Sequence, residues 1–178
     1  MTKSKEFEIL VENLLFSYRQ LCLNEIMHEK VGGDFYNKFI PTWNTILLSL
    51  EKDYLLGLAK IFEVPKKFKE TISIYYFLDY KLSNYDESIE RITNLRNKMF
   101  AHLDVKKMLV REEFLKENAM NIAEVKSLFD IAIEIVDQIK ENFEFNQDLK
   151  QISNQIVKDT RSEFEEWFKV FRKGFIMS

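Results

Sequence analysis

Hydrophobic residues recur at intervals of three and four along most of the chain, which is the spacing that places them on one face of a helix. The pattern is clearest over residues 122–143 and also marks residues 5–29 and 43–62. A shorter and less regular segment covers 67–80, and two more helices are predicted over about 83–103 and 147–171. The pattern therefore predicts an up-and-down bundle of four to five main helices.

The composition supports an all-α fold. The 178 residues include only four glycines and two prolines, too few for the frequent turns of a strand-rich fold. With 46% hydrophobic and 31% charged residues, we expect one globular domain over residues 1–178. The final helix, from about 147, is aromatic in its second half and packs either on its own bundle or on a partner subunit. Its aromatic residues are Phe164, Trp167, Phe168 and Phe171.

Charge and hydropathy narrow the classes of function. The net charge of −3 argues against indiscriminate nucleic-acid binding but leaves room for a local basic site. No apolar run is long enough for a membrane span, and no secretory h-region begins the chain. One cysteine, Cys22, cannot form an internal disulfide and is expected to be a packed thiol. We therefore expect a cytoplasmic protein with no membrane association.

Local signals predict how some helices begin and meet. Asn84 with Glu87, and Asn121 with Glu124, have the spacing of a capping box. Thr42 is a possible cap for the second helix. Gly57 predicts close approach of another backbone, since it has no side chain to keep a neighbour away. The charged stretch from residue 104 to residue 119 is predicted to be an exposed connection.

Several chemistries are excluded by residue type. Two histidines and one cysteine cannot form a zinc finger or a cysteine-rich cluster, so no metal site is expected. No P-loop, dinucleotide fingerprint or nucleophile elbow is present, so no cofactor is expected. His28 lies at the predicted end of the first helix, where a solvated histidine suits the helix dipole.

One residue does not fit the hydrophobic pattern of the central helix. Arg96 falls within the stripe, and His102 falls on its flank. A buried arginine is costly unless a carboxylate pairs with it or a water-filled cleft receives it. The stripe itself consists of Ile89, Ile92, Leu95, Met99 and Leu103.

Arg96 and His102 are together sufficient for one type of RNA cleavage. A neutral imidazole can take a proton from a ribose 2′-hydroxyl, and a guanidinium can hold a phosphate through two parallel hydrogen bonds. Asn97 can orient a phosphate oxygen or the imidazole. On one ideal helix Arg96 and His102 are about 120° apart, so they converge only if the helix ends near His102 or a second copy faces the first.

The motif has a family resemblance. Arg96-Asn-Lys-Met-Phe-Ala-His102 resembles the Arg-polar-x(3–5)-His signature of the HEPN superfamily, and the extension to Asp104 resembles its abortive-infection branch. Residues 57–63, Gly-Leu-Ala-Lys-Ile-Phe-Glu, also resemble a segment of that branch. The resemblance implies a bundle of four to five helices over most of the chain, a homodimer and, in active members, a metal-independent ribonuclease. Arg96 and His102 would be catalytic and Asn97 supporting, whereas Asp104 either orients His102 or caps the helix.

Two hypotheses about function follow. The first is a metal-independent endoribonuclease of a phage-defence or toxin–antitoxin system, with RNA as substrate and an antitoxin or other regulatory protein as a possible partner. The second is a catalytically inactive HEPN-like module that binds a nucleotide, RNA or protein in the same groove. A third alternative, in which Arg96 pairs with a carboxylate of a neighbouring helix and His102 caps the helix end, requires neither function.

Overall fold

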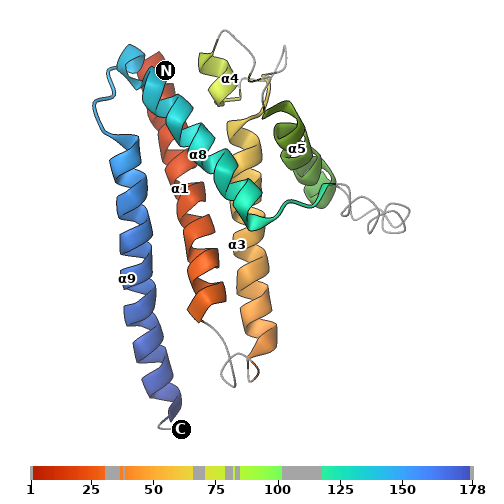
Figure 1. Ribbon diagram of the computed structural model, residues 1–178, viewed down its shortest axis with the longest axis vertical. Coiled ribbons are helices and arrows are strands. Elements are labelled where there is room, and N and C mark those ends of the chain that lie inside the picture. Colours follow the sequence, from red (N-terminus) through yellow and green to blue (C-terminus); the bar gives the residue numbers. More distant parts are fainter. Residues whose placement is uncertain are drawn as a thin grey trace.

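The computed structural model describes residues 2–30, 37, 39–65, 71–78, 82, 85–101 and 118–176, without the side chains of 98–101, 175 and 176. Within these ranges the regular elements are helices and none is a strand, which confirms the all-α prediction. Five long helices alternate in direction in Figure 1: α1 (Lys3–Lys30), α3 (Ile40–Ile61), α5 (Asp86–Ala101), α8 (Ile122–Ile139) and α9 (Leu149–Ile176). A short α4 (Ile74–Phe77) and a 3₁₀ turn, η2 (Lys140–Phe143), complete them.

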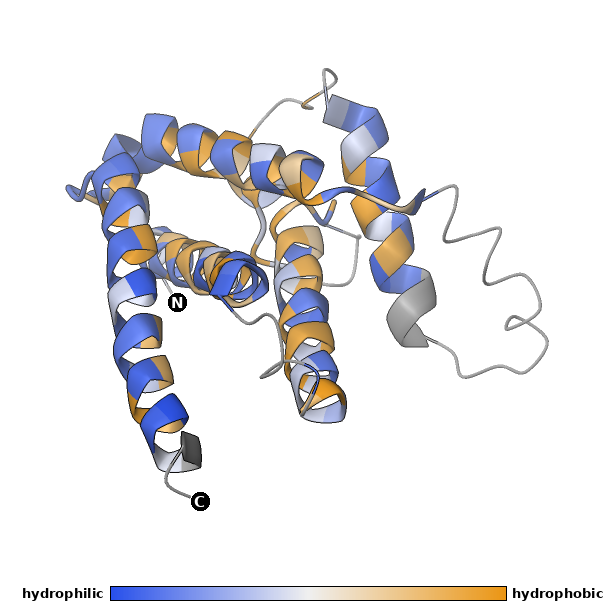
Figure 2. Cartoon of the chain, turned by 60° about the horizontal axis from the view of Figure 1, so that its bottom comes forward, coloured by the Kyte–Doolittle hydropathy of each residue, from blue (hydrophilic) through white to orange (hydrophobic). Residues whose placement is uncertain are grey.

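Helix α1 is the centre of the bundle. It contacts α3, α9 and α8. In Figure 1, α9, α1, α3 and α5 follow one another across the molecule, and α8 crosses diagonally over α1 and α3. The hydrophobic sides of α8 and α9 face this centre (Figure 2). None of the helices in the described ranges combines the length and the hydropathy that a membrane span requires.

The main core lies where α1, α3, α5 and α8 meet, as the helical spacing predicts. Its largest fully buried members include Phe7, Leu14, Leu58, Ile92 and Phe129. Cys22 is 2% exposed, so the prediction of a packed thiol is confirmed. The predicted close approach at Gly57 is also confirmed, because a Cβ there would lie 1.9 Å from Ser17 Oγ of α1.

A second, smaller core joins α9 to the end of α1 and the beginning of α3. Trp43 of α3 is 2% exposed, and the rings of Trp167, Phe168 and Phe171 approach it edge-on at 6.3, 6.4 and 6.2 Å between centroids. Phe164 is also buried. In the described chain these aromatic residues of α9 pack against residues of α1 and α3.

Several predicted helix ends were wrong. Helix α3 begins at Ile40 rather than Trp43, and its N-cap is Phe39, so Thr42 is not the cap. Pro41 lies in the first turn, where the missing N–H of proline costs no helical hydrogen bond. Helix α8 ends at Ile139, and the 3₁₀ turn η2 follows it instead of another α-helical turn.

The least regular hydrophobic pattern, over residues 67–80, gave the least accurate helix prediction. Of the segment predicted as 67–80, only Ile74–Phe77 is helical within the described residues 71–78. Helix α9 begins at Leu149 and continues to Ile176, beyond the predicted end at residue 171. The proposed Asn84 cap, and residues 104–117 of the predicted exposed connection, lie outside the described residues.

Candidate functional site

Helix α5 carries the first half of the candidate motif. Ile89, Ile92 and Leu95 are 7%, 0% and 4% exposed, so the predicted stripe faces the core. The helix contacts α3 on one side and α8 on another. Arg96 follows Leu95 directly, and its side chain remains only 18% exposed. The helix therefore places a mostly buried guanidinium beside the core.

Arg96 is paired with a carboxylate. Its Nη1 lies 2.9 Å from Oε2 of Glu63, whose side chain is 16% exposed. Glu63 directly follows the C-cap of α3 and donates its backbone N–H to the carbonyl of Lys60. The ion pair thus ties α5 to the end of α3. It is the pairing that an arginine on a buried stripe needs, and it resolves the misfit in the hydrophobic pattern.

The opposite edge of the guanidinium is held by the next residue in the chain. Nε and Nη2 of Arg96 lie 3.2 and 3.0 Å from Asn97 Oδ1 and donate to it. Because Glu63 and Asn97 act on different nitrogens, the plane of the guanidinium has one defined orientation. Asn97 is exposed, and its amide oxygen serves the arginine.

A second arginine fixes the other flank of α5. Nη1 and Nη2 of Arg91 lie 3.0 and 3.4 Å from the two carboxylate oxygens of Glu124, and Nη2 also donates to the carbonyl of Ala119. The Arg91 guanidinium, together with a hydrogen bond from Asn121, lowers the pKa of Glu124. Arg91 therefore joins α5 to the beginning of α8.

Glu124 also takes part in the predicted capping box. Its backbone N–H donates to Asn121 Oδ1 at 2.9 Å, and the Asn121 backbone N–H donates to Glu124 Oε2 at 2.8 Å. The spacing of these residues predicted the cap, and the structure confirms it. The partnership of Glu124 with Arg91 has no local signature in the sequence, and neither does that of Glu63 with Arg96.

Two of the four predicted site residues can be placed. Arg96 and Asn97 lie together on α5, whereas His102 and Asp104 lie outside the described residues. The other histidine, His28, is exposed in the last turn of α1, as expected. No three His, Cys, Asp or Glu side chains within the described ranges are grouped so as to hold a metal ion.

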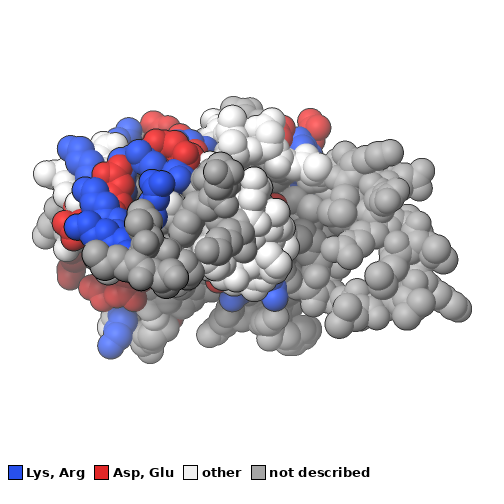
Figure 3. Space-filling view, turned by 90° about the horizontal axis from the view of Figure 1, so that it is seen from below, with Lys and Arg blue, Asp and Glu red and all other residues white. Residues whose placement is uncertain are grey.

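The charge around the lower end of the molecule is mixed. Seen from below, Lys and Arg side chains gather over α9 with Asp and Glu side chains between them (Figure 3). Arg161 pairs with Glu29 at 2.8 Å, and Lys30 lies 3.3 Å from Glu165. Among the described residues, Arg161 and Lys30 therefore already have acidic partners.

Comparison of this chain with protein-family models, curated proteins and solved structures finds no match.

Proposed function

We propose that this protein is a metal-independent endoribonuclease of the HEPN type that acts as a homodimer in phage defence or as the toxin of a toxin–antitoxin pair. What supports the proposal is the sequence motif from Arg96 to His102, in which Asn97 also holds the guanidinium of Arg96. A guanidinium held in one orientation is suited to a phosphate whose charge grows during reaction.

The proposed reaction needs only side chains of the chain itself. The imidazole of His102 takes the proton of a ribose 2′-hydroxyl, and the 2′-oxygen attacks the adjacent phosphorus. The bond from phosphorus to the 5′-oxygen breaks, and the protonated imidazole returns its proton to that oxygen, so the products are a 2′,3′-cyclic phosphate and a 5′-hydroxyl. Arg96 stabilises the negative charge on the non-bridging oxygens.

A dimer addresses the geometry of the motif. On one straight helix, Arg96 and His102 point about 120° apart. A two-fold axis that sets two copies of α5 against each other brings two arginines and two histidines into one groove. In this arrangement Asn97 supports Arg96, and Asp104 orients His102 or caps the helix end.

Glu63 favours a second candidate function. Its carboxylate already occupies Nη1 of Arg96, so an incoming phosphate must displace or share this partner. If the pair persists, Arg96 cannot neutralise a reacting phosphate, and the groove would bind a nucleotide, RNA or another protein without cleaving RNA. This second candidate predicts stoichiometric binding with no turnover.

Incubation of the purified protein with total RNA in excess EDTA tests the proposal. We expect wild-type protein to produce 2′,3′-cyclic phosphate ends, and His102→Ala and Arg96→Ala proteins to produce none while retaining wild-type helicity by circular dichroism. His28→Ala is the matched control, because it removes the other, exposed histidine and should leave activity unchanged. Light scattering of the same samples measures the oligomeric state.

Two results would count against the enzyme. Equal cleavage by wild-type and His102→Ala proteins would remove the proposed base. Absence of cleavage by all variants, combined with RNA binding that Arg96→Ala abolishes, would favour the non-enzymatic module.

A further inference from the structure

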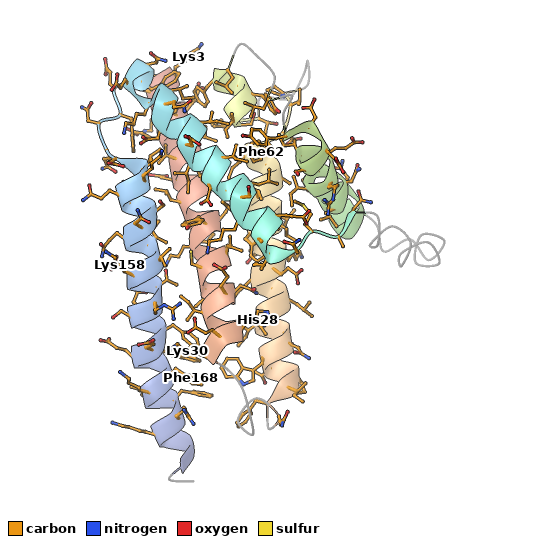
Figure 4. The ribbon with its side chains drawn as sticks, viewed as in Figure 1. Lys3, His28, Lys30, Phe62, Lys158 and Phe168 are labelled. Atoms are coloured by element: carbon orange, nitrogen blue, oxygen red, sulfur yellow. The ribbon has the colours of Figure 1, made fainter. Side chains whose placement is uncertain are left out.

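A cleft of about 760 Å³ lies over the C-terminal half of α1 and the middle of α3, beside the beginning of α8. Figure 4 labels His28, one of its lining residues, near the lower end of α1. Leu95 of α5 and Arg161 of α9 also reach it. Arg96 and Glu63 are not among its described lining residues, so the cleft does not include the part of the proposed cleavage site that the structure describes.

The inner wall of the cleft is apolar. Ile26, Leu55, Leu95 and Val125 come from four different helices and line it together with Met120. A ligand with a hydrocarbon part would bury that part here, at a gain proportional to the area removed from water.

The two basic residues of the cleft have ion-pair partners, whereas one of its carboxylates has none in the described part of the chain. Lys126 Nζ lies 3.3 Å from both carboxylate oxygens of Glu25, and Arg161 donates to both oxygens of Glu29 at 3.0 and 2.8 Å. These contacts pair each basic residue with one acidic residue. Glu51 remains as an exposed carboxylate with no ion pair in the described part of the chain.

Tyr54 lies one turn after Glu51 on the same face of α3 and lines the same cleft. It is only 5% exposed, yet its hydroxyl has no hydrogen-bond partner among the described residues. Burial raises the pKa of Tyr54 far above its usual range, and the nearby charges of Glu51 and Glu25 raise it further. The phenol therefore stays neutral. The hydroxyl oxygen is not fully enclosed, so a polar group of a ligand in the cleft can reach it and form a hydrogen bond.

We propose that this cleft binds a small organic cation, with an ammonium or guanidinium group on an apolar chain. The apolar chain lies against Ile26, Leu55 and Val125. The cationic group donates one hydrogen bond to Tyr54 Oη and pairs with the carboxylate of Glu51. An anion of the same shape is repelled, because the carboxylates among the described lining residues outnumber the lysine and arginine. The proposal does not depend on the ribonuclease activity.

Isothermal titration calorimetry of the full-length protein tests this proposal with hexylammonium as the probe. Hexanoate and hexanol are matched probes that have a similar chain and a negative or no charge. We expect hexylammonium to bind, hexanol to bind more weakly and hexanoate not to bind. Tyr54→Phe should weaken hexylammonium binding about tenfold through loss of a hydrogen bond to a charged group. Glu51→Gln should weaken it roughly two- to fivefold.

Glu141→Gln is the control variant, since it removes an exposed carboxylate in η2 that is not among the described lining residues of the cleft. Its affinity for hexylammonium should equal that of the wild-type protein. Tyr54→Phe preserves the ring and Glu51→Gln changes an exposed group, so both variants should fold, and their melting temperatures check this. Absence of hexylammonium binding, binding of hexanoate of equal strength, or unchanged affinity in both cleft variants would each overturn the proposal.

Discussion

Arg96 Nη1 and Glu63 Oε2 lie 2.9 Å apart, and both side chains are less than one-fifth exposed. A partly buried pair of this kind contributes little over two apolar residues, but removing one partner leaves an uncompensated charge. The pair therefore couples two properties of the protein, the docking of α5 on the end of α3 and the availability of the guanidinium to a phosphate.

The first prediction concerns this coupling. Glu63→Ala should lower the free energy of unfolding by about 1–3 kcal/mol, because the guanidinium of Arg96 loses its carboxylate partner. The Glu63→Ala/Arg96→Ala double variant should lose less than the sum of the two single variants. Urea unfolding measures all three, and Glu8→Ala, which removes an exposed glutamate of α1, is the control. Strict additivity would show that the contact contributes nothing to stability.

The second prediction concerns the contact between α1 and α3. In Gly57→Ala the new Cβ would lie 1.9 Å from Ser17 Oγ and 2.7 Å from Ser17 Cβ. We expect a loss of about 1–3 kcal/mol despite the better helix propensity of alanine, because the two helices must separate or distort. Gly174→Ala is a matched control, since nothing lies within 4 Å of that position, and it should be neutral or slightly stabilising.

A second substitution tests whether steric overlap causes the loss of stability in Gly57→Ala. Ser17→Gly removes both atoms that the new methyl group meets, so it should restore part of the stability of Gly57→Ala protein. The thermal unfolding midpoint of the double variant would lie above that of Gly57→Ala alone. A double variant that is less stable than both single variants would mean that the overlap is not the cause.

Local sequence signals predicted those features that neighbouring residues determine. The Asn121–Glu124 cap depends on a spacing of three residues, and the buried stripe of α5 depends on helical periodicity, so both could be read from the sequence. Glu63 could not be identified as the partner of Arg96, because the contact exists only after α3 and α5 have packed. The same holds for Glu124, whose cap was predicted and whose pairing with Arg91 was not.

The errors have similar causes. The beginning of α3 was predicted at Trp43, after Pro41 and the possible cap Thr42, but Pro41 is compatible with a first helical turn and the helix starts before it. The cleft beside Tyr54 was not predicted at all, because its walls come from helices that are far apart in the sequence. Hydrophobic periodicity reports which face of a helix is buried and does not report where neighbouring helices leave space.

The third prediction is a pH dependence that arises at Asp137. Burial of this carboxyl tends to raise its pKa, but hydrogen bonds from Lys140 Nζ and from the backbone N–H of Leu149 hold it below its usual value of 3.8. Because the folded-state pKa is the lower one, the contribution to stability is complete above the unfolded pKa and is lost as pH falls through the folded pKa. The relevant window therefore lies below about pH 4.

The Asp137→Asn variant tests the direction in which this contribution to stability changes with pH. The difference in unfolding free energy between wild type and variant should be constant from about pH 5 to pH 7 and should shrink below about pH 4. Glu141→Gln, an exposed carboxylate in the turn that follows α8, should show no comparable trend. A difference that grows towards acidic pH would contradict the assignment of the lowered pKa to Asp137.

The last prediction concerns the aromatic core between α9 and α3. Phe164 is 6% exposed, and its ring stacks on that of Phe168 with 5.5 Å between the ring centroids. Trp167 is 46% exposed. Phe164→Ala should cost about 3–5 kcal/mol, because it leaves a cavity between two helices of the same chain. Trp167→Ala removes a ring that is half in water and should cost roughly half as much or less. Both variants should keep the oligomeric state of wild type, as light scattering would show. If Phe164→Ala instead dissociated an oligomer at unchanged monomer stability, α9 would pack on a partner subunit and the smaller core would lie between two chains.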